Sequence, residues 1–134
     1  PGEKTSKEMI LPLEGIKSSE FGVRRFINGQ PRNRHTGLDL AADEGVSIVV
    51  PLKGKVILAD SFFYKGNVVY IDHGNGLVSS YSHLSKSLVS LNQSISTGEE
   101  LGLVGSTGRV TGPHLHWEVY FLGIPLNPEI FIKN

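Results

Sequence analysis

Two short segments far apart in the chain carry the side chains best suited to binding a metal ion. They are His35-Thr36-Gly37-Leu38-Asp39 and His114-Leu115-His116. Each is predicted to lie on a strand, where side chains two or four residues apart point to the same face. With no cysteine in the chain, imidazole nitrogen and carboxylate oxygen are the available zinc ligands. A catalytic zinc takes three protein ligands and one water, so these four side chains supply a set with one histidine to spare.

The competing interpretation is that these histidines are structural, since a single histidine on a strand usually is. The combination of both segments, with glycines nearby and Pro113 directly before His114, favours a metal site. Two further histidines complete the five in the chain. His83 ends an expected strand and alone would be assigned to a turn or surface. His73 lies in an expected turn and is predicted to be structural, because turn histidines usually bond to local backbone.

Glu118 shares the strand face of the two histidines before it, whereas Trp117 points to the opposite face and is predicted to fill the core. Two roles are open for Glu118. One is that of a general base, as for the glutamate of H-E-x-x-H metallopeptidases. The other, which we expect, is that of a hydrogen-bond acceptor behind the metal or a charge on its rim.

The elements that must position these residues are short strands separated by Gly, Pro, Asn and Asp. Hairpin turns are expected at Asn28-Gly29 and within Asp72–Gly76, and a helical turn at Asn127–Phe131. No window of a dozen residues shows a convincing helical period. The expected strands are Ile16–Phe21, Val23–Pro31, His35–Leu40, Val46–Val50, Lys55–Phe62, Val68–Asp72, Leu77–Leu84, Glu100–Val104 and Leu115–Leu122.

This pattern predicts an all-β fold, an antiparallel sandwich or barrel-like single domain with glycine-rich turns. In such a fold His35 and His116 can sit on adjacent strands. At 134 residues the chain is sized for one domain. Residues 1–9 are polar and are predicted to be a linker or arm, and residues 10–134 to form the domain.

The overall composition limits the possible partners. A formal net charge of zero argues against a nucleic-acid binder, and no stretch approaches the ~18–20 apolar residues of a membrane span. The lack of cysteine leaves the compartment open. Because the chain opens at Pro1 rather than methionine, we expect a processed product or an excised domain whose targeting signal is missing.

Taken together, the motifs resemble the LytM/lysostaphin-type zinc metallopeptidases of bacterial cell walls. The similarity lies in H-x-x-x-D at 35–39, S-H-L at 82–84 and G-x-T-G-x-x-T-G-P-H-L-H-W at 105–117, and extends from about Pro12 to Pro128. The resemblance implies zinc as the cofactor. It places the zinc ligands on His35, Asp39 and His116, and the catalytic histidines that do not bind zinc on His83 and His114.

The resemblance also implies a mechanism. Zinc lowers the pKa of its bound water from 15.7 toward ~7, and one of His83 and His114 takes the proton of that water. The two together stabilise the oxyanion and protonate the leaving amine; which does which is open. Family members often carry a tyrosine just before the first ligand, which residues 31–34 lack. The candidate substitutes are Tyr81, Arg24, Arg25 and Arg34.

By this resemblance the chain is expected to be a zinc endopeptidase that hydrolyses peptide crosslinks of peptidoglycan, acting as a monomer in the periplasm or cell envelope. The segment Phe26–Pro31 looks like Gram-negative members that cut between D-alanine and meso-diaminopimelate, so a D,D-endopeptidase is preferred. A glycyl-glycine endopeptidase is one alternative, although those members usually carry a wall-binding domain. The other is a non-catalytic LytM-type regulator that activates a cell-wall amidase; the five filled positions argue against it.

Overall fold

The computed structural model describes residues 8–19, 24–27, 30–34, 36–108, 110 and 112–132, and for residues 18–34 it describes only strand positions. The named strands pair antiparallel throughout. The described residues contain no α-helix, and one 3-10 helix, η1 (Pro128–Phe131), is capped by Asn127. The all-β prediction and the predicted helical turn are therefore confirmed. Within these ranges no helix is long and apolar enough to cross a membrane.

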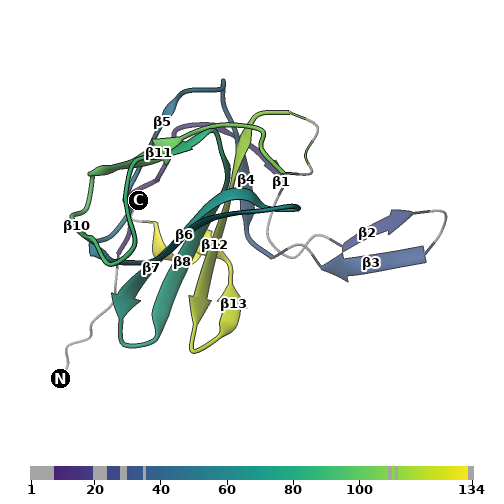
Figure 1. Ribbon diagram of the computed structural model, residues 1–134. Coiled ribbons are helices and arrows are strands. Elements are labelled where there is room, and N and C mark those ends of the chain that lie inside the picture. The colour runs from purple at the N-terminus through teal and green to yellow at the C-terminus, as the bar shows by residue number, and fades with distance from the viewer. Residues whose placement is uncertain are drawn as a thin grey trace.

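The main sheet runs through the whole body of the molecule (Figure 1). Its strand order is β1-β4-β12-β8-β7-β6-β10, and β13 pairs with β12 beside this path. The bounds are β1 (Ile16–Ser19), β4 (Leu38–Ala41), β6 (Gly54–Phe62), β7 (Gly66–Gly74), β8 (Leu77–Leu84), β10 (Ser94–Ile95), β12 (His114–Phe121) and β13 (Ile124–Leu126).

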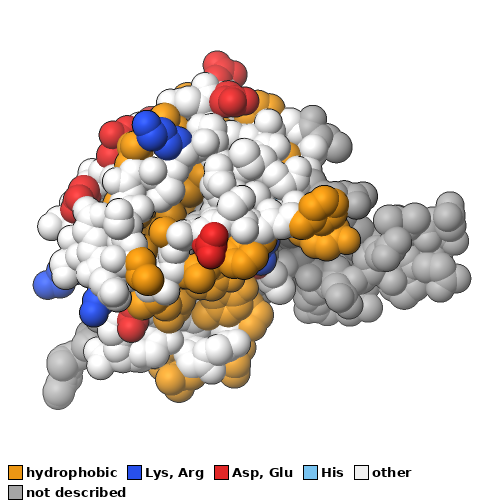
Figure 2. Space-filling view, in the orientation of Figure 1, with side chains coloured by type: hydrophobic (Ala, Val, Ile, Leu, Met, Phe, Trp, Pro, Cys, Tyr) orange, Lys and Arg blue, Asp and Glu red, His pale blue; other side chains and the backbone are white. Residues whose placement is uncertain are grey.

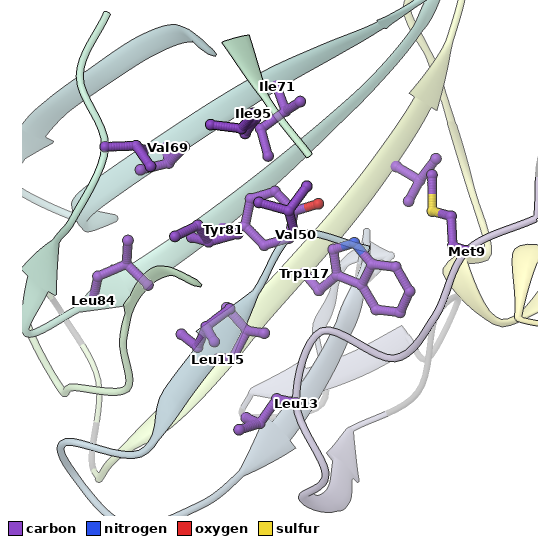
Figure 3. Close-up of a cluster of buried hydrophobic side chains, with 14 of the residues drawn as sticks. Met9, Leu13, Val50, Val69, Ile71, Tyr81, Leu84, Ile95, Leu115 and Trp117 are labelled. Atoms are coloured by element: carbon purple, nitrogen blue, oxygen red, sulfur yellow. The ribbon is translucent and has the colours of Figure 1, made fainter. Parts of the chain in front are cut away.

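A smaller sheet of β5 (Ser47–Val49), β11 (Glu100–Leu103) and β9 (Lys86–Ser87) covers one face of the main sheet. The core lies between the two layers, where Ile48 and Leu101 of the small sheet join Tyr81 and Trp117 of the large one. Figure 3 shows Tyr81 and Trp117 among the buried hydrophobic side chains of this cluster. Burial of a large apolar side chain is worth ~1.5–3 kcal/mol, so this interface holds the two sheets together as the predicted sandwich.

Strand alternation on β12 decides which side chains reach the core. Leu115, Trp117 and Val119 are all fully buried in the core cluster. The predicted core position of Trp117 is therefore confirmed (Figure 3). The residues between them face the other side of the sheet, which the small sheet does not cover.

One hairpin turn expected from the sequence is confirmed, and a second strand pair flanks the other expected turn. Between β7 and β8, Asn75 (φ 53°) and Gly76 (φ 85°) take the left-handed backbone that a two-residue hairpin turn requires. Between β2 (Arg24–Ile27) and β3 (Gln30–Arg34), Ile27 pairs with Gln30, and the predicted turn at Asn28-Gly29 itself lies outside the described residues. This second hairpin extends away from the body (Figure 1).

Three expectations about the elements need correction. The strand expected from His35 begins at Leu38, because Gly37 has a φ of 105° that a strand does not allow. Met9, expected in a loose arm, is buried in the core and bridges to Ile132. The short strands β9, β10 and β13 were missed; the last contains Pro125, which is tolerated because β13 is an edge strand.

The surface carries mixed charges. On the face shown in Figure 2, acidic and basic side chains are scattered rather than gathered into a patch of one sign, and hydrophobic side chains are grouped in the lower middle of the view, in the region of β8, β12 and β13. For the described residues in this view, the surface is consistent with the zero net charge of the chain.

Candidate metal centre and its histidines

The candidate site is built on three adjacent strands, with β12 between β4 and β8. His116 lies directly opposite Asp39 on one side and Ser82 on the other. Opposite residues in an antiparallel pair carry their side chains on the same face, ~4.5–5.5 Å apart at Cβ. The His116 Nδ1 atom is 2.7 Å from Asp39 Oδ1, although the two residues are 77 positions apart. Two of the three predicted ligands therefore meet at one point.

The third predicted ligand, His35, lies outside the described residues. The strand alternation used to align His35 with Asp39 does not hold in its simple form, because β4 begins only at Leu38 and Gly37 interrupts the extended backbone. Within the part of the chain that the structure describes, no group of three acidic, histidine or cysteine side chains is arranged to hold a metal ion. The ligand set stays a prediction, with two of its members in contact.

Glu118 lies behind His116 and contacts its other nitrogen, with 3.2 Å between Nε2 and Oε2. The carboxylate is buried and accepts hydrogen bonds from Thr36 Oγ1 and Ser80 Oγ, both at 2.8 Å. Lys65 Nζ lies 3.4 Å from Oε1. A carboxylate engaged by these groups is held in place, as expected for an acceptor that orients a metal-bound imidazole.

These contacts set the ionisation of Glu118 and His116. Burial alone would raise the pKa of Glu118, but the hydrogen bond and charge of His116, the charge of Lys65 and the bond from Ser80 hold it well below its usual range. Burial likewise disfavours the charged form of His116, yet the hydrogen bonds to Asp39 and Glu118 prevail and raise its pKa to about 9. These contacts therefore favour the carboxylate form of Glu118 and the charged form of His116.

His83 reaches the same face through an irregularity in β8. Between the pairs Asn67–Leu84 and Val69–Tyr81, β8 has two residues where β7 has one, which is a β-bulge. His83 occupies this bulge with a φ of 68°, and its N–H donates to Lys65 O at 2.8 Å. Its ring centroid lies 5.0 Å from that of His114 and 6.3 Å from that of His116. The bulge thus turns His83 toward the other two imidazoles.

The rings of His83 and His114 are held differently from that of His116. Each places Nδ1 against a backbone carbonyl, that of Thr107 at 2.8 Å for His83 and that of Gly112 at 3.0 Å for His114. A carbonyl only accepts hydrogen bonds, so Nδ1 carries the proton and Nε2 keeps its lone pair in the neutral ring. His114 Nε2 lies 3.8 Å from Asp39 Oδ1. Burial, the largest influence, lowers the pKa of His83 and favours this neutral form.

Two other residues considered from the sequence, Tyr81 and His73, lie away from the site. Tyr81 is fully buried and its hydroxyl lies 2.6 Å from Ser79 Oγ on the core side, so its suggested role near the oxyanion is wrong. His73 binds Lys53 O and Ser79 Oγ in the same region, which agrees with a structural role. The side chains of Arg24, Arg25 and Arg34 lie outside the described residues.

The donor chemistry fits zinc. A carboxylate oxygen and an imidazole nitrogen are zinc ligands, and His116 points the nitrogen that Glu118 does not occupy at Asp39. Directly across from His116, the buried hydroxyl of Ser82 has no hydrogen-bond partner within the described residues. A buried hydroxyl rarely stays unpaired, so this polar atom is available to a bound group.

The sequence reasoning missed the residues that hold the site together, namely Thr36, Lys65, Ser80 and Thr107. Alternation could have placed Ser80 and Ser82 on one face of β8, but Ser79 and His83 are polar as well, so the strand carries no clear pattern that marks this face as the site. The contacts of Lys65 and Thr107 come from turns far away in sequence, and no local pattern indicates them.

Comparisons with known proteins agree on one family. Residues 33–128 match the sequence profile of peptidase family M23. The chain is 45% identical over 111 residues, 82% of its length, to the peptidoglycan DD-endopeptidase ShyA of Vibrio cholerae. It is 40% identical over 111 residues, 83% of its length, to the DD-carboxypeptidase/endopeptidase Mpg of Neisseria meningitidis. In both cases it spans 26% of the relative, so the chain covers about a quarter of these proteins.

A solved structure shows the same architecture. The crystal structure of a zinc containing peptidase from Vibrio cholerae superposes with a TM-score of 0.83 at 32% identity, covering 91% of this chain and 39% of that chain. The fold and the histidine-containing segments therefore both agree with the zinc-containing peptidases of this kind.

Proposed function

The chain belongs to peptidase family M23, the family of the LytM/lysostaphin-type enzymes, and from this premise we propose that it is a zinc-dependent endopeptidase that hydrolyses peptide crosslinks of peptidoglycan. The preferred bond is that between D-alanine and meso-diaminopimelate. Its similarity to a peptidoglycan DD-endopeptidase supports this choice of substrate. We further propose that it acts outside the cytoplasm, in the periplasm or cell envelope, as a monomer.

The observation that carries the catalytic part of the proposal is the different anchoring of the imidazoles. His116 directs Nδ1 at Asp39 Oδ1, whereas His83 and His114 bind backbone carbonyls through Nδ1 and keep Nε2 for proton transfer. This division supports His35, Asp39 and His116 as the residues that would hold zinc, and His83 and His114 as catalytic residues. Strand alternation alone could not separate His114 from His116.

In this site the bound zinc would supply a water of lowered pKa and polarise the scissile carbonyl. The unprotonated Nε2 of His83 or His114 accepts the proton of the attacking water. The imidazolium formed in this step returns that proton to the leaving amine as the C–N bond breaks, and the other histidine, where it enters the reaction already protonated, donates a hydrogen bond to the oxyanion. Burial of His83 favours its neutral form, which suits it to the role of the base.

Glu118 is proposed as a positioning residue rather than the base. Its carboxylate accepts hydrogen bonds from Thr36 and Ser80 and contacts His116 and Lys65. A base needs a free oxygen within hydrogen-bond reach of the water, and both oxygens of Glu118 are engaged. Its place behind His116 suits an acceptor that fixes the ligand imidazole.

The test is to offer the zinc-loaded protein purified crosslinked muropeptide dimers and pentaglycine at equal concentration, with products weighed by mass spectrometry. We expect monomers that have gained one water for each bond cut, glycan strands left whole, and pentaglycine intact. His114→Ala at full zinc occupancy is the inactive control. Cleavage of pentaglycine with the dimers left intact would show that the enzyme is a glycyl-glycine endopeptidase instead. No cleavage of either substrate would overturn the peptidase proposal.

A further inference from the structure

The ring of His83 is held by a segment that is distant in sequence, the turn at Thr107. The Thr107 carbonyl accepts the hydrogen bond of His83 Nδ1 at 2.8 Å, across 24 positions. This carbonyl determines where the imidazole carries its proton, since only a protonated Nδ1 can donate to it. The direction of the carbonyl in turn depends on what holds Thr107.

The Thr107 hydroxyl ties the turn to both strands of the bulge that carries His83. It donates to Leu84 O at 2.7 Å and accepts from the N–H of Asn67 at 3.0 Å. Asn67 and Leu84 are paired across β7 and β8, immediately beside the bulge. The Asn67 side chain also donates to Leu84 O at 2.9 Å. One hydroxyl therefore fixes the turn relative to the backbone on either side of His83.

Close backbone packing leaves the turn little freedom to move toward the β6–β7 hairpin. A Cβ atom at Gly66 would overlap Thr107, and one at Gly108 would lie 2.5 Å from Tyr64 O and 2.6 Å from Gly66 N. Both glycines have positive φ angles, of 69° and 84°. The carbonyl of Lys65, the residue before Gly66, accepts the hydrogen bond of the His83 backbone N–H. The hairpin and the Thr107 turn thus hold the backbone and the ring of His83 respectively.

We propose that Thr107 is a positioning residue of the active site, whose hydroxyl fixes the carbonyl that sets the tautomer and direction of the His83 ring. The inference rests on the proposed function, in which His83 Nε2 exchanges a proton with water or the leaving group. Without the hydroxyl, the turn loses its attachment to Leu84 and Asn67, and because the packing restrains it only on the side of the β6–β7 hairpin, it can move the other way and turn the carbonyl from Nδ1. The ring is then free to rotate or to carry its proton on Nε2, where it cannot accept another.

The first measurement uses the unaltered zinc-loaded protein. Long-range proton–nitrogen NMR of histidine-labelled protein reports which ring nitrogen of each neutral histidine carries hydrogen, and His83→Ala assigns its signals. We expect His83 to be protonated on Nδ1. A neutral His83 protonated on Nε2 overturns the proposal, whether or not any variant folds and whatever substrate the enzyme cuts.

The second measurement compares three variants at full zinc occupancy. Thr107→Val keeps the branched shape and removes the hydroxyl, and Thr107→Ser keeps the hydroxyl. The matched control is Thr97→Val, since Thr97 Oγ1 also accepts a backbone N–H, that of Lys53 at 2.9 Å, but lies outside the site. The readouts are zinc content, kcat and KM on crosslinked dimers, and the His83 tautomer.

Thr107→Val should lower kcat by roughly tenfold or more, equivalent to ~1.4 kcal/mol, with KM and zinc content little changed and the Nδ1-protonated form of His83 depleted. Thr107→Ser and Thr97→Val should behave as the unaltered protein. The proposal fails if Thr107→Val keeps its kcat, if the serine variant is equally impaired, or if kcat falls only in step with zinc. An unaltered enzyme that cuts no crosslink contradicts the proposed function instead, while the tautomer still tests Thr107.

Discussion

Replacing Glu118 by glutamine removes one negative charge from behind His116 while preserving the shape of the side chain. The carboxylate is 3% exposed and lies 3.2 Å from His116 Nε2. Groups that orient a metal-bound histidine typically contribute 10–100-fold in metal affinity, which corresponds to ~1.4–2.8 kcal/mol. We therefore expect Glu118→Gln to weaken zinc binding by about 10–100-fold.

The same variant separates the two roles open for Glu118. If it only positions His116, kcat at saturating zinc should fall by no more than about 10–100-fold. If it is the general base, its loss should cost about 10²–10⁴-fold in kcat even with zinc bound. Protein stability should fall by ~1–3 kcal/mol, because an amide has one acceptor oxygen where Thr36, Ser80 and Lys65 now meet two.

The assay has two parts. Zinc affinity is measured by competition with a chelator, and kcat is then measured on crosslinked dimers at saturating zinc. Glu100→Gln is the matched control, because Glu100 is an exposed carboxylate on β11, outside the site. Unchanged zinc affinity in Glu118→Gln, or a loss of about 10³-fold in kcat at full occupancy, would refute the positioning role.

Three further predictions follow from the site. His35→Ala, Asp39→Ala and His116→Ala should each lower zinc content measured by inductively coupled plasma mass spectrometry, whereas His114→Ala should keep zinc and lose activity; the reverse behaviour of the two β12 histidines would exchange their roles. Burial lowers the pKa of His83 from 6.5, so its neutral form persists below that pH and is lost only as the pH falls through the lowered value; an NMR titration midpoint above 6.5 contradicts this. Gly37→Ala should lower both thermal stability and zinc affinity, because Gly37 has a φ of 105° and a Cβ would lie 2.7 Å from Trp117 O and 2.8 Å from Glu118 Cγ. Gly45→Ala is the control, because Gly45 has a φ of 93° but no atom within 4 Å of its Cβ, so this substitution introduces backbone strain without a steric overlap. Equal effects of the two substitutions would show that the contact with Glu118 is unimportant.

Residues on regular strands could be placed from the sequence. Alternation put His114, His116 and Glu118 on one face of β12 and Trp117 on the other, and the structure agrees. The pattern is local, since each side chain's face follows from its neighbours two positions away. The turn pair at 75–76 was recognisable for the same reason, because its left-handed backbone selects asparagine and glycine.

Residues whose positions depend on irregular backbone could not be placed this way. By alternation, Ser82 and not His83 should share the face of His116, and only the bulge beside Val69 brings His83 to that face. A bulge is one extra residue in one strand, and it is fixed by contacts with distant segments such as Lys65 and Thr107. The interruption at Gly37 is a similar case. These residues are visible in the sequence, but the two-residue alternation of a strand does not reveal which face they occupy.

The contrast between regular and irregular backbone has a chemical reason. Metal ligands must stand a fixed short distance apart, and opposite residues on paired strands provide this directly, as the proposed ligands His116 and Asp39 illustrate. A general base must instead lie beside the attacking water. The position of that water is set by the proposed ligands on the paired strands β4 and β12. On β8 the regular position facing that point belongs to Ser82, so a second side chain from the same strand reaches it only through a local change in backbone. The left-handed φ of His83 costs ~1–2 kcal/mol, and its hydrogen bonds to Lys65 and Thr107 offset that cost. The strain therefore lies where the proposed chemistry needs a second imidazole.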